Sequence, residues 1–126
     1  MSERKKSVKK PRVLVLEDEV IIGMDIEAFL WDEGFEVMLT TDCDVAIQWL
    51  SAETPDVAVL DVQLKNGVCT PLAKKLVSKN IPFIVHTGAG IEGRDQVFRK
   101  GMLMVKPVGH SDLAEAIKAL LAPTSE

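Results

Sequence analysis

The sequence predicts an α/β protein in which a doubly wound parallel sheet of five strands alternates with five helices. Short apolar runs, each containing valine, recur at residues 12–16, 35–39, 57–60, 82–86 and 102–105. The stretches between them carry apolar residues at the period of an α-helix. Strands that alternate with helices are joined by right-handed crossovers, so the strands run parallel and the helices cover both faces of the sheet.

The first half of the chain supplies three of these strands. Residues 12–16 predict a strand buried on both faces, and the helix after it has apolar residues at i, i+4, i+7 and i+8 and ends at Gly34. Residues 35–39 form the second strand, and Thr41 or Asp42 can cap the helix that follows. Residues 57–60 are entirely apolar, which predicts a central strand.

The second half supplies the other two strands. Residues 65–67 are a turn signal, and the helix after them has a buried side of Leu72, Leu76 and Val77. Residues 82–86 form the fourth strand, and residues 91–100 predict a short, weakly apolar helix. Residues 102–105 form the fifth strand, which Pro107 ends, and the last helix buries Leu113, Ile117, Leu120 and Leu121.

Length and composition indicate one globular domain. The chain has 126 residues, of which 47% are hydrophobic and 27% charged. No apolar run approaches the length of a membrane span, and the basic start lacks the apolar stretch of a signal peptide, so we expect a cytoplasmic protein. Cys43 and Cys69 lie far apart in the sequence without CxxC spacing, so we expect reduced thiols.

Charge divides the chain into a tail and a body. Residues 1–11 carry a net charge of +4, and the other 115 residues carry −8. We expect residues 1–11 to be a disordered leader, residues 12–122 to be the domain and residues 123–126 to be a short C-terminal tail. The leader has no aromatic residue for base stacking, and nucleic acid phosphates would repel the acidic body. Neither nucleic acid nor a membrane is therefore an expected partner.

Polar residues follow four of the predicted strands directly. Glu17 and Asp18 follow the first strand and Asp61 the third, while Thr87 and Lys106 follow the fourth and fifth. Ligands of such sheets bind outside the carboxyl ends of the strands, where these side chains converge. Three carboxylates at one edge repel one another unless a cation lies among them, and Mg²⁺ with its preference for oxygen ligands suits the set.

The set predicts phosphoryl chemistry. A carboxylate on the central strand can act as a nucleophile toward a phosphoryl donor, so Asp61 is the expected phosphate acceptor. Mg²⁺ and the Lys106 ammonium would neutralise charge on the phosphoryl oxygens. The Thr87 hydroxyl can donate a hydrogen bond to one of these oxygens, and Gly88 leaves room for the phosphate and offers its N–H.

Four segments at consecutive strand ends resemble the response-regulator receiver domain of two-component signalling. They are VLVLEDE, VAVLDVQL, FIVHTG and VKPVG, and the resemblance covers residues 12–122. It implies the CheY-like, flavodoxin-like fold with strand order 2-1-3-4-5. It also implies that Glu17, Asp18, Asp61 and the backbone carbonyl of Gln63 hold Mg²⁺, and that Thr87 and Lys106 bind the phosphoryl group.

The resemblance implies partners as well. A sensor histidine kinase or a histidine phosphotransferase would supply the phosphoryl group. Residues 91–121 would form the face that contacts an unknown downstream protein.

The sequence departs from the common receiver pattern at two places. Leu103 stands where many receivers carry an aromatic switch residue, and residues 63–67 replace the usual proline and glycine loop after the phosphate acceptor. Both features partly resemble the FATGUY-type receivers. Leu103 bears on how the signal is read and leaves the phosphorylation chemistry unaffected.

Two alternative functions remain open on the residues alone. One is a degenerate receiver that binds a partner constitutively, and the intact set of five polar residues argues against it. The other is a Mg²⁺-dependent aspartyl phosphohydrolase, but such enzymes place a second acid two residues after the nucleophile, where this chain has Gln63. We expect no turnover of a separate substrate. His86 could be a metal ligand or a competing phosphate acceptor, although a lone histidine near a strand end is more often structural.

Overall fold

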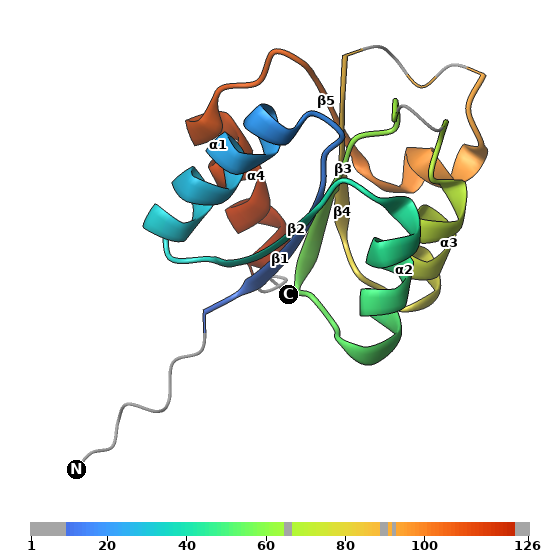
Figure 1. The fold of residues 1–126 in the computed structure, drawn as a ribbon, viewed down its shortest axis with the longest axis horizontal. Helices are drawn as coiled ribbons and strands as arrows, with labels where there is room; N and C mark the ends of the chain where they lie inside the picture. Colours follow the sequence, from blue (N-terminus) through green and yellow to red (C-terminus); the bar gives the residue numbers. More distant parts are fainter. Residues whose placement is uncertain (1–9, 65–66, 89–90, 92, 123–126) are drawn as a thin grey trace.

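Five parallel strands form one sheet in the order β2-β1-β3-β4-β5 in the computed structural model (Figure 1). The structure describes residues 10–64, 67–88, 91 and 93–122. The strands are β1 (Arg12–Leu16), β2 (Glu36–Thr40), β3 (Val57–Leu60), β4 (Phe83–Thr87) and β5 (Met102–Val105). The helices are α1 (Val20–Asp32), α2 (Cys43–Ala52), α3 (Thr70–Ser78) and α4 (His110–Leu121), with a 3-10 helix η1 (Gln96–Lys100). The predicted fold class and strand order are confirmed.

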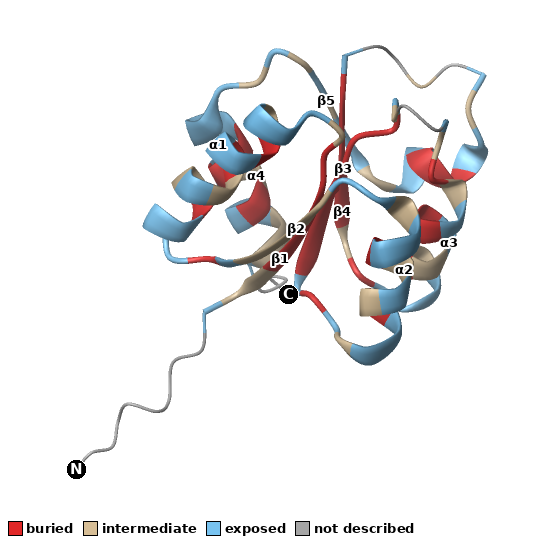
Figure 2. Cartoon of the chain, in the orientation of Figure 1, coloured by how far each residue is buried: buried red, intermediate tan, exposed pale blue. Residues whose placement is uncertain are grey.

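The helices cover both faces of the sheet, α1 and α4 on one side and α2 and α3 on the other (Figure 1). Because side chains alternate along a strand, each buried strand feeds two cores. Val13 and Val15 point toward α1 and α4, whereas Leu14 and Leu16 point toward α2 and α3. Figure 2 shows the resulting band of buried residues through the middle of the sheet.

The strand register brings the strand ends to one edge. Leu16 of β1 pairs with Leu60 of β3, and Thr87 of β4 pairs with Val105 of β5. The residues that follow these strands therefore lie side by side. Most of the predicted functional side chains belong to this set.

One predicted helix is shorter than expected. The sequence favoured a helix over residues 91–100, but the described part of that segment contains only the 3-10 helix η1, whose first turn Asp95 caps with its side chain. Only Val97 and Phe98 of η1 are buried, so little apolar surface is available to stabilise a longer helix here.

The prediction of two reduced thiols is wrong for this structure, because Cys43 and Cys69 form a disulfide. Cys43 is the first residue of α2, and Cys69 immediately precedes α3. These two helices pack side by side on the same face of the sheet (Figure 1). Proximity therefore comes from the crossover topology, which the spacing of 26 residues in the sequence does not reveal.

No helix in the described part of the chain is long and apolar enough to cross a membrane. The N-terminal leader, except for Lys10 and Pro11, and the C-terminal tail lie outside the described residues.

Candidate functional site

Asp61 lies at the centre of the edge where the strands end. It directly follows the fully buried β3, and its own exposure is 5%. Its backbone N–H donates to the Leu16 carbonyl at 2.9 Å, which extends the β1–β3 ladder by one residue. One carboxylate oxygen, Oδ1, accepts a 2.9 Å hydrogen bond from the Gln63 N–H. The backbone of Asp61 is therefore fixed to β1, and one oxygen of its carboxylate is held by the Gln63 N–H.

Lys106 joins the acids of two other strands. Its ammonium nitrogen Nζ donates to Asp61 Oδ2 at 3.0 Å and to Glu17 Oε1 at 3.0 Å. Its backbone N–H donates to the Thr87 carbonyl at 2.7 Å, which fixes the end of β5 against β4. A cis peptide bond to Pro107 follows immediately. The sequence predicted that Lys106 lies at the same edge as the acids, but it predicted neither of these two direct contacts.

Burial and charge act in opposite directions on Glu17 and Lys106. Burial raises the pKa of the Glu17 carboxyl, and the hydrogen bonds from the Glu19 N–H and Lys106 offset only part of that effect. Burial lowers the pKa of Lys106, but the hydrogen bonds and charges of Asp61 and Glu17 act more strongly, so its pKa is raised. The Lys106 ammonium is therefore charged at neutral pH, and the buried Glu17 carboxylate would gain from a second cation.

Asp18 lies beside this cluster and faces open space. It is partly exposed and lines a pocket of about 310 Å³. Leu64 and residues of the segments 41–44 and 67–71 line the same pocket. The pocket brings solvent to the edge of the sheet next to the buried acids. An ion could therefore reach Asp18 without rearrangement of the core.

The donor groups fit Mg²⁺ by their chemistry. Asp18 and Asp61 offer carboxylate oxygens and Gln63 offers a backbone carbonyl, and Mg²⁺ is usually held by one or two carboxylates while it keeps several waters. The described residues contain no group of three or more His, Cys, Asp or Glu side chains arranged as a metal site by itself. A magnesium ion here would thus depend on water and backbone oxygens as well as on acids.

The remaining predicted residues differ in exposure. Thr87 is fully buried at the end of β4, whereas Gly88 and Gln63 are exposed. A Cβ atom added at Gly88 would lie 3.7 Å from Gln63 Oε1, an ordinary contact, so the space beside Gly88 is open. Leu103 lies on β5 with 43% of its surface exposed.

The burial of His86 indicates a structural role. It is 5% exposed, and burial followed by the charge of Lys106 lowers its pKa to about 4. It lies on the wall of a largely apolar pocket of about 350 Å³ between α1 and α4. The ring is therefore neutral at neutral pH, and no cluster of further metal-binding side chains surrounds it in the described structure.

The comparison with known families decides which family the domain belongs to. The family model of the response regulator receiver domain matches residues 13–118, which is most of the chain. This chain belongs to the response-regulator receiver family. The receiver motifs at the four strand ends are thus part of a match that extends over the whole domain.

Relatives of this receiver agree with the assignment. The transcriptional regulatory protein PdtaR of Mycobacterium tuberculosis is 34% identical over 114 residues, which cover 85% of this chain and 55% of PdtaR. The BeF3-activated solution structure of SdrG from Pseudomonas melonis Fr1 is 34% identical with a TM-score of 0.71, covering 88% of this chain and 96% of SdrG. The receiver therefore spans about half the length of the curated relatives it matches.

A more distant receiver shows the same fold with a metal. The receiver domain of the sensor histidine kinase PA1611 from Pseudomonas aeruginosa PAO1 was solved with magnesium in its active site cleft. It is 21% identical to this receiver with a TM-score of 0.77, and the match covers 90% of this chain and 98% of that one.

Proposed function

We propose that this receiver is a phosphorylation-controlled signalling module that accepts a phosphoryl group on Asp61 in the presence of Mg²⁺. The donor would be the phosphohistidine of a sensor histidine kinase or of a histidine phosphotransferase. The observation that carries the proposal is the contact of the Lys106 ammonium with both Asp61 and Glu17 at 3.0 Å. A buried acid beside a fixed cation at the open end of a parallel sheet suits transfer of an anionic group.

Asp61 has the geometry that a nucleophile needs. Its carboxylate is held by the Gln63 N–H at 2.9 Å and by Lys106 at 3.0 Å, so little motion is needed before attack. A carboxylate oxygen would attack phosphorus and form an acyl phosphate, while the phosphorus–nitrogen bond of the phosphohistidine breaks and the neutral imidazole leaves after protonation. Lys106 would then hold an oxygen of the transferred group.

Five other residues would support the transfer. Asp18, Asp61, the Gln63 carbonyl and Glu17, directly or through water, would hold Mg²⁺, whose charge balances that of the phosphoryl oxygens. The Thr87 hydroxyl and the Gly88 N–H would donate hydrogen bonds to the phosphoryl group. Nearby open space at Gly88 supports this assignment, because an added Cβ there would meet only Gln63 Oε1 within 4 Å.

The output would be a change in protein binding or onward transfer of the phosphoryl group. Three exposed apolar side chains of β5 lie within the expected contact face of residues 91–121: Met102, Leu103 and Val105. Because Leu103 replaces the usual aromatic switch residue, the signal would travel through Thr87 and the loop that follows it. Residues 89, 90 and 92 of that loop lie outside the described residues.

The setting of the domain is part of the same proposal. Residues 12–122 would be the receiver, preceded by a basic leader at 1–11 and followed by a short tail at 123–126. The protein would act in the cytoplasm on protein partners. The net charge of −8 outside the leader supports protein rather than nucleic acid as the partner.

Acetyl phosphate tests the proposal without a kinase. Wild type incubated with Mg²⁺ and acetyl phosphate should gain acid-labile phosphate, and Asp61→Asn should gain none. Asp25→Asn, which changes an exposed acid on α1, is the matched control and should be labelled like wild type. Equal labelling of Asp61→Asn would refute Asp61 as the acceptor, and rapid turnover of phosphate esters would instead indicate a phosphohydrolase.

Lys106 offers a second test of the same site. Lys106→Met should slow phosphorylation by about 100-fold, the usual cost of losing one preorganised charge at a reacting oxygen. Lys100→Met, an exposed lysine in η1, is the matched control and should leave the rate unchanged. A Lys106→Met variant that is labelled at the wild-type rate would remove this residue from the mechanism.

A further inference from the structure

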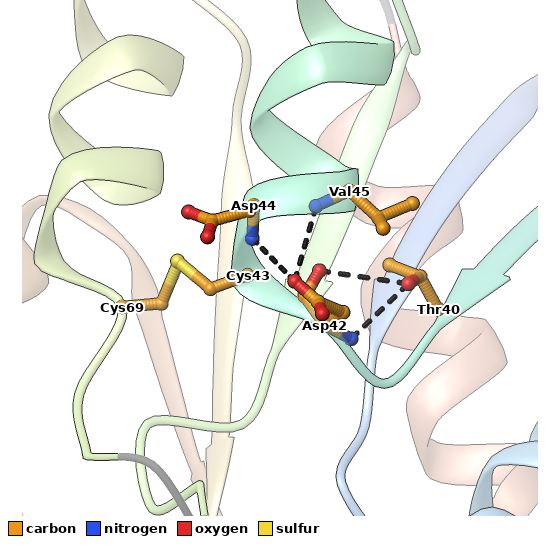
Figure 3. Close-up of a disulfide and its surroundings, with 6 residues drawn as sticks. All are labelled: Thr40, Asp42, Cys43, Asp44, Val45 and Cys69. Carbon is orange, nitrogen blue, oxygen red and sulfur yellow. Dashed lines mark hydrogen bonds between the residues drawn. A yellow bond between two sulfur atoms is a disulfide. The ribbon is translucent and has the colours of Figure 1, made fainter.

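The disulfide lies at the edge of the sheet that carries the proposed phosphorylation site. Cys43 begins α2 directly after its N-cap Asp42, and Cys69 immediately precedes α3 (Figure 3). The bond joins two Cα atoms 5.8 Å apart, a distance within the usual range for disulfides. It therefore connects the starts of two helices that lie at the same edge of the sheet as Asp61.

The segment between Asp61 and Cys69 links the bond to the proposed chemistry. It begins with Asp61 and Gln63, whose N–H donates to the Asp61 carboxylate at 2.9 Å. Leu64 and Gly67 then exchange backbone hydrogen bonds of 3.2 and 3.0 Å. The segment ends at Cys69, so the disulfide fixes one end of it and β3 fixes the other.

Both cysteines and Asp18, an acid of the proposed site, line the same pocket. Cys43, Cys69, Leu64 and Gly67 line the pocket of about 310 Å³ that Asp18 also lines. Cys69 is buried, with 4% exposure, whereas Cys43 is half-buried. A small thiol or disulfide reagent in this pocket would therefore reach Cys43 first.

We propose that Cys43 and Cys69 form a reversible thiol–disulfide switch that sets how firmly residues 61–64 and 67–69 are held and so tunes Mg²⁺ binding and phosphorylation at Asp61. This inference rests on the proposed function of Asp61. The observation that carries it is the shared pocket together with the direct chain connection from Asp61 to Cys69.

The chemistry balances with a low-molecular-weight disulfide such as oxidised glutathione as the oxidant. The Cys43 thiolate attacks one sulfur of that disulfide, forms a mixed disulfide and releases one glutathione thiolate. The Cys69 thiolate then attacks Cys43 Sγ, closes the protein disulfide and releases the second glutathione. Two protein thiols are oxidised, and one disulfide is reduced to two thiols. Excess reduced glutathione drives the same steps backward.

The oxidised form is the active one in this scheme. The bond limits the positions that residues 67–69 can take and, through the Leu64–Gly67 hydrogen bonds, those of Gln63, so the Gln63 carbonyl is already close to its place when Mg²⁺ arrives. Reduction frees the end at Cys69 and leaves the segment more positions to explore. Outer partners of a metal site commonly change its affinity by about 10-fold or more, so we expect the Kd for Mg²⁺ to rise by roughly 3- to 10-fold on reduction.

The first experiment asks whether the bond is reversible. Purified protein is equilibrated in glutathione buffers of varied ratio, its free thiols are trapped with an alkylating reagent, and the fraction oxidised is read by intact mass. A switch gives a titration between fully reduced and fully oxidised protein. Protein that never forms the bond, or that stays oxidised in reduced glutathione alone, overturns the proposal.

The second experiment separates the switch from the proposed function. Oxidised and reduced wild type and a Cys43→Ser/Cys69→Ser variant are compared for Mg²⁺ affinity by calorimetry and for labelling rate with acetyl phosphate. The oxidised protein should bind Mg²⁺ more tightly and label faster, and the double variant should match the reduced protein under both conditions. Equal affinity and rate in both redox forms overturn the switch but leave the function of Asp61 intact. Absence of label in every form refutes the proposed function itself.

Discussion

Strands β3 and β5 are both four-residue apolar strands of one sheet, yet the protein uses their apolar surfaces differently. All of β3 is buried, whereas β5 exposes 37% of Met102, 43% of Leu103 and 50% of Val105. Asp61 directly follows β3 and Lys106 directly follows β5, and Lys106 Nζ lies 3.0 Å from Asp61 Oδ2. The difference indicates that the buried β3 fixes Asp61 firmly, while β5 carries Lys106 at its end and an apolar surface that folding leaves uncovered.

Replacing one leucine of each strand by alanine should show this difference most strongly in the free energy of unfolding. Leu60→Ala opens a cavity in the fully buried β3 and should lower the free energy of unfolding by about 2–5 kcal/mol. Leu103→Ala on β5 should lower it by no more than about 0.5 kcal/mol, because much of that side chain is already in water. Urea unfolding followed by circular dichroism measures both. Equal losses would show that the exposed surface of β5 is part of the core after all.

Reduction of the disulfide should weaken the side of the sheet near β3. The bond closes a loop between residues 26 apart in the sequence, and a loop of that size gives about 3 kcal/mol in the chain-entropy description. Reduced wild type and the Cys43→Ser/Cys69→Ser variant should both unfold at lower urea concentration than oxidised wild type. Hydrogen exchange should become faster in the segment 61–69 and in the first turns of α2 and α3, and stay unchanged in β5 and α4. Faster exchange throughout the molecule would contradict a local effect.

Strand β4, which lies between β3 and β5, should make the stability of the protein depend on pH through His86. Its pKa falls from 6.5 to about 4 on folding, so below about pH 6.5 the unfolded chain binds a proton that the folded protein does not. The free energy of unfolding should therefore decrease as the pH is lowered, by about 2 kcal/mol between pH 7.5 and pH 5. Thermal unfolding at a series of pH values tests this. His86→Gln should lack this part of the slope, and a slope identical to that of wild type would exclude His86 as its source.

The smallest effect on folding, and the one that bears on output, is expected at the exposed surface of β5. Leu103→Ser and Val105→Ser should change the free energy of unfolding by about 0.5 kcal/mol or less and leave labelling of Asp61 at the wild-type rate. Each should weaken binding of a downstream protein recovered with the phosphorylated form. Val45→Ser, an equally exposed apolar residue on α2, is the matched control. If both β5 variants bind the partner as strongly as wild type does, the contact face lies elsewhere.

The strand ends were predictable, and the bond between the helices was not. The valine-containing runs identified all five strands, although only β1, β3 and β4 are buried on both faces, where a continuous apolar sequence is expected. The parallel order then placed Glu17, Asp61 and Lys106 at one edge. The sequence could not reveal the disulfide, because proximity of Cys43 and Cys69 depends on how α2 and α3 pack. A signal was nevertheless present, since each cysteine lies at the start of a helix that follows a strand end at that edge.

Two further features depended on packing. The segment before β5 had a helical pattern that was too weakly apolar, and only η1 forms in its described part. The double contact of Lys106 depends on the direction of one flexible side chain, which no spacing in the sequence determines.

The central claim is that Asp61 takes the phosphoryl group, and chemical mapping of the labelled residue tests it most directly. Protein treated with Mg²⁺ and acetyl phosphate is reduced with borohydride, which converts an aspartyl phosphate to homoserine, and then digested and sequenced by mass spectrometry. The expected result is homoserine at position 61 and at no other aspartate. Homoserine at Asp18, phosphate on His86 or an unmodified protein would each contradict the account.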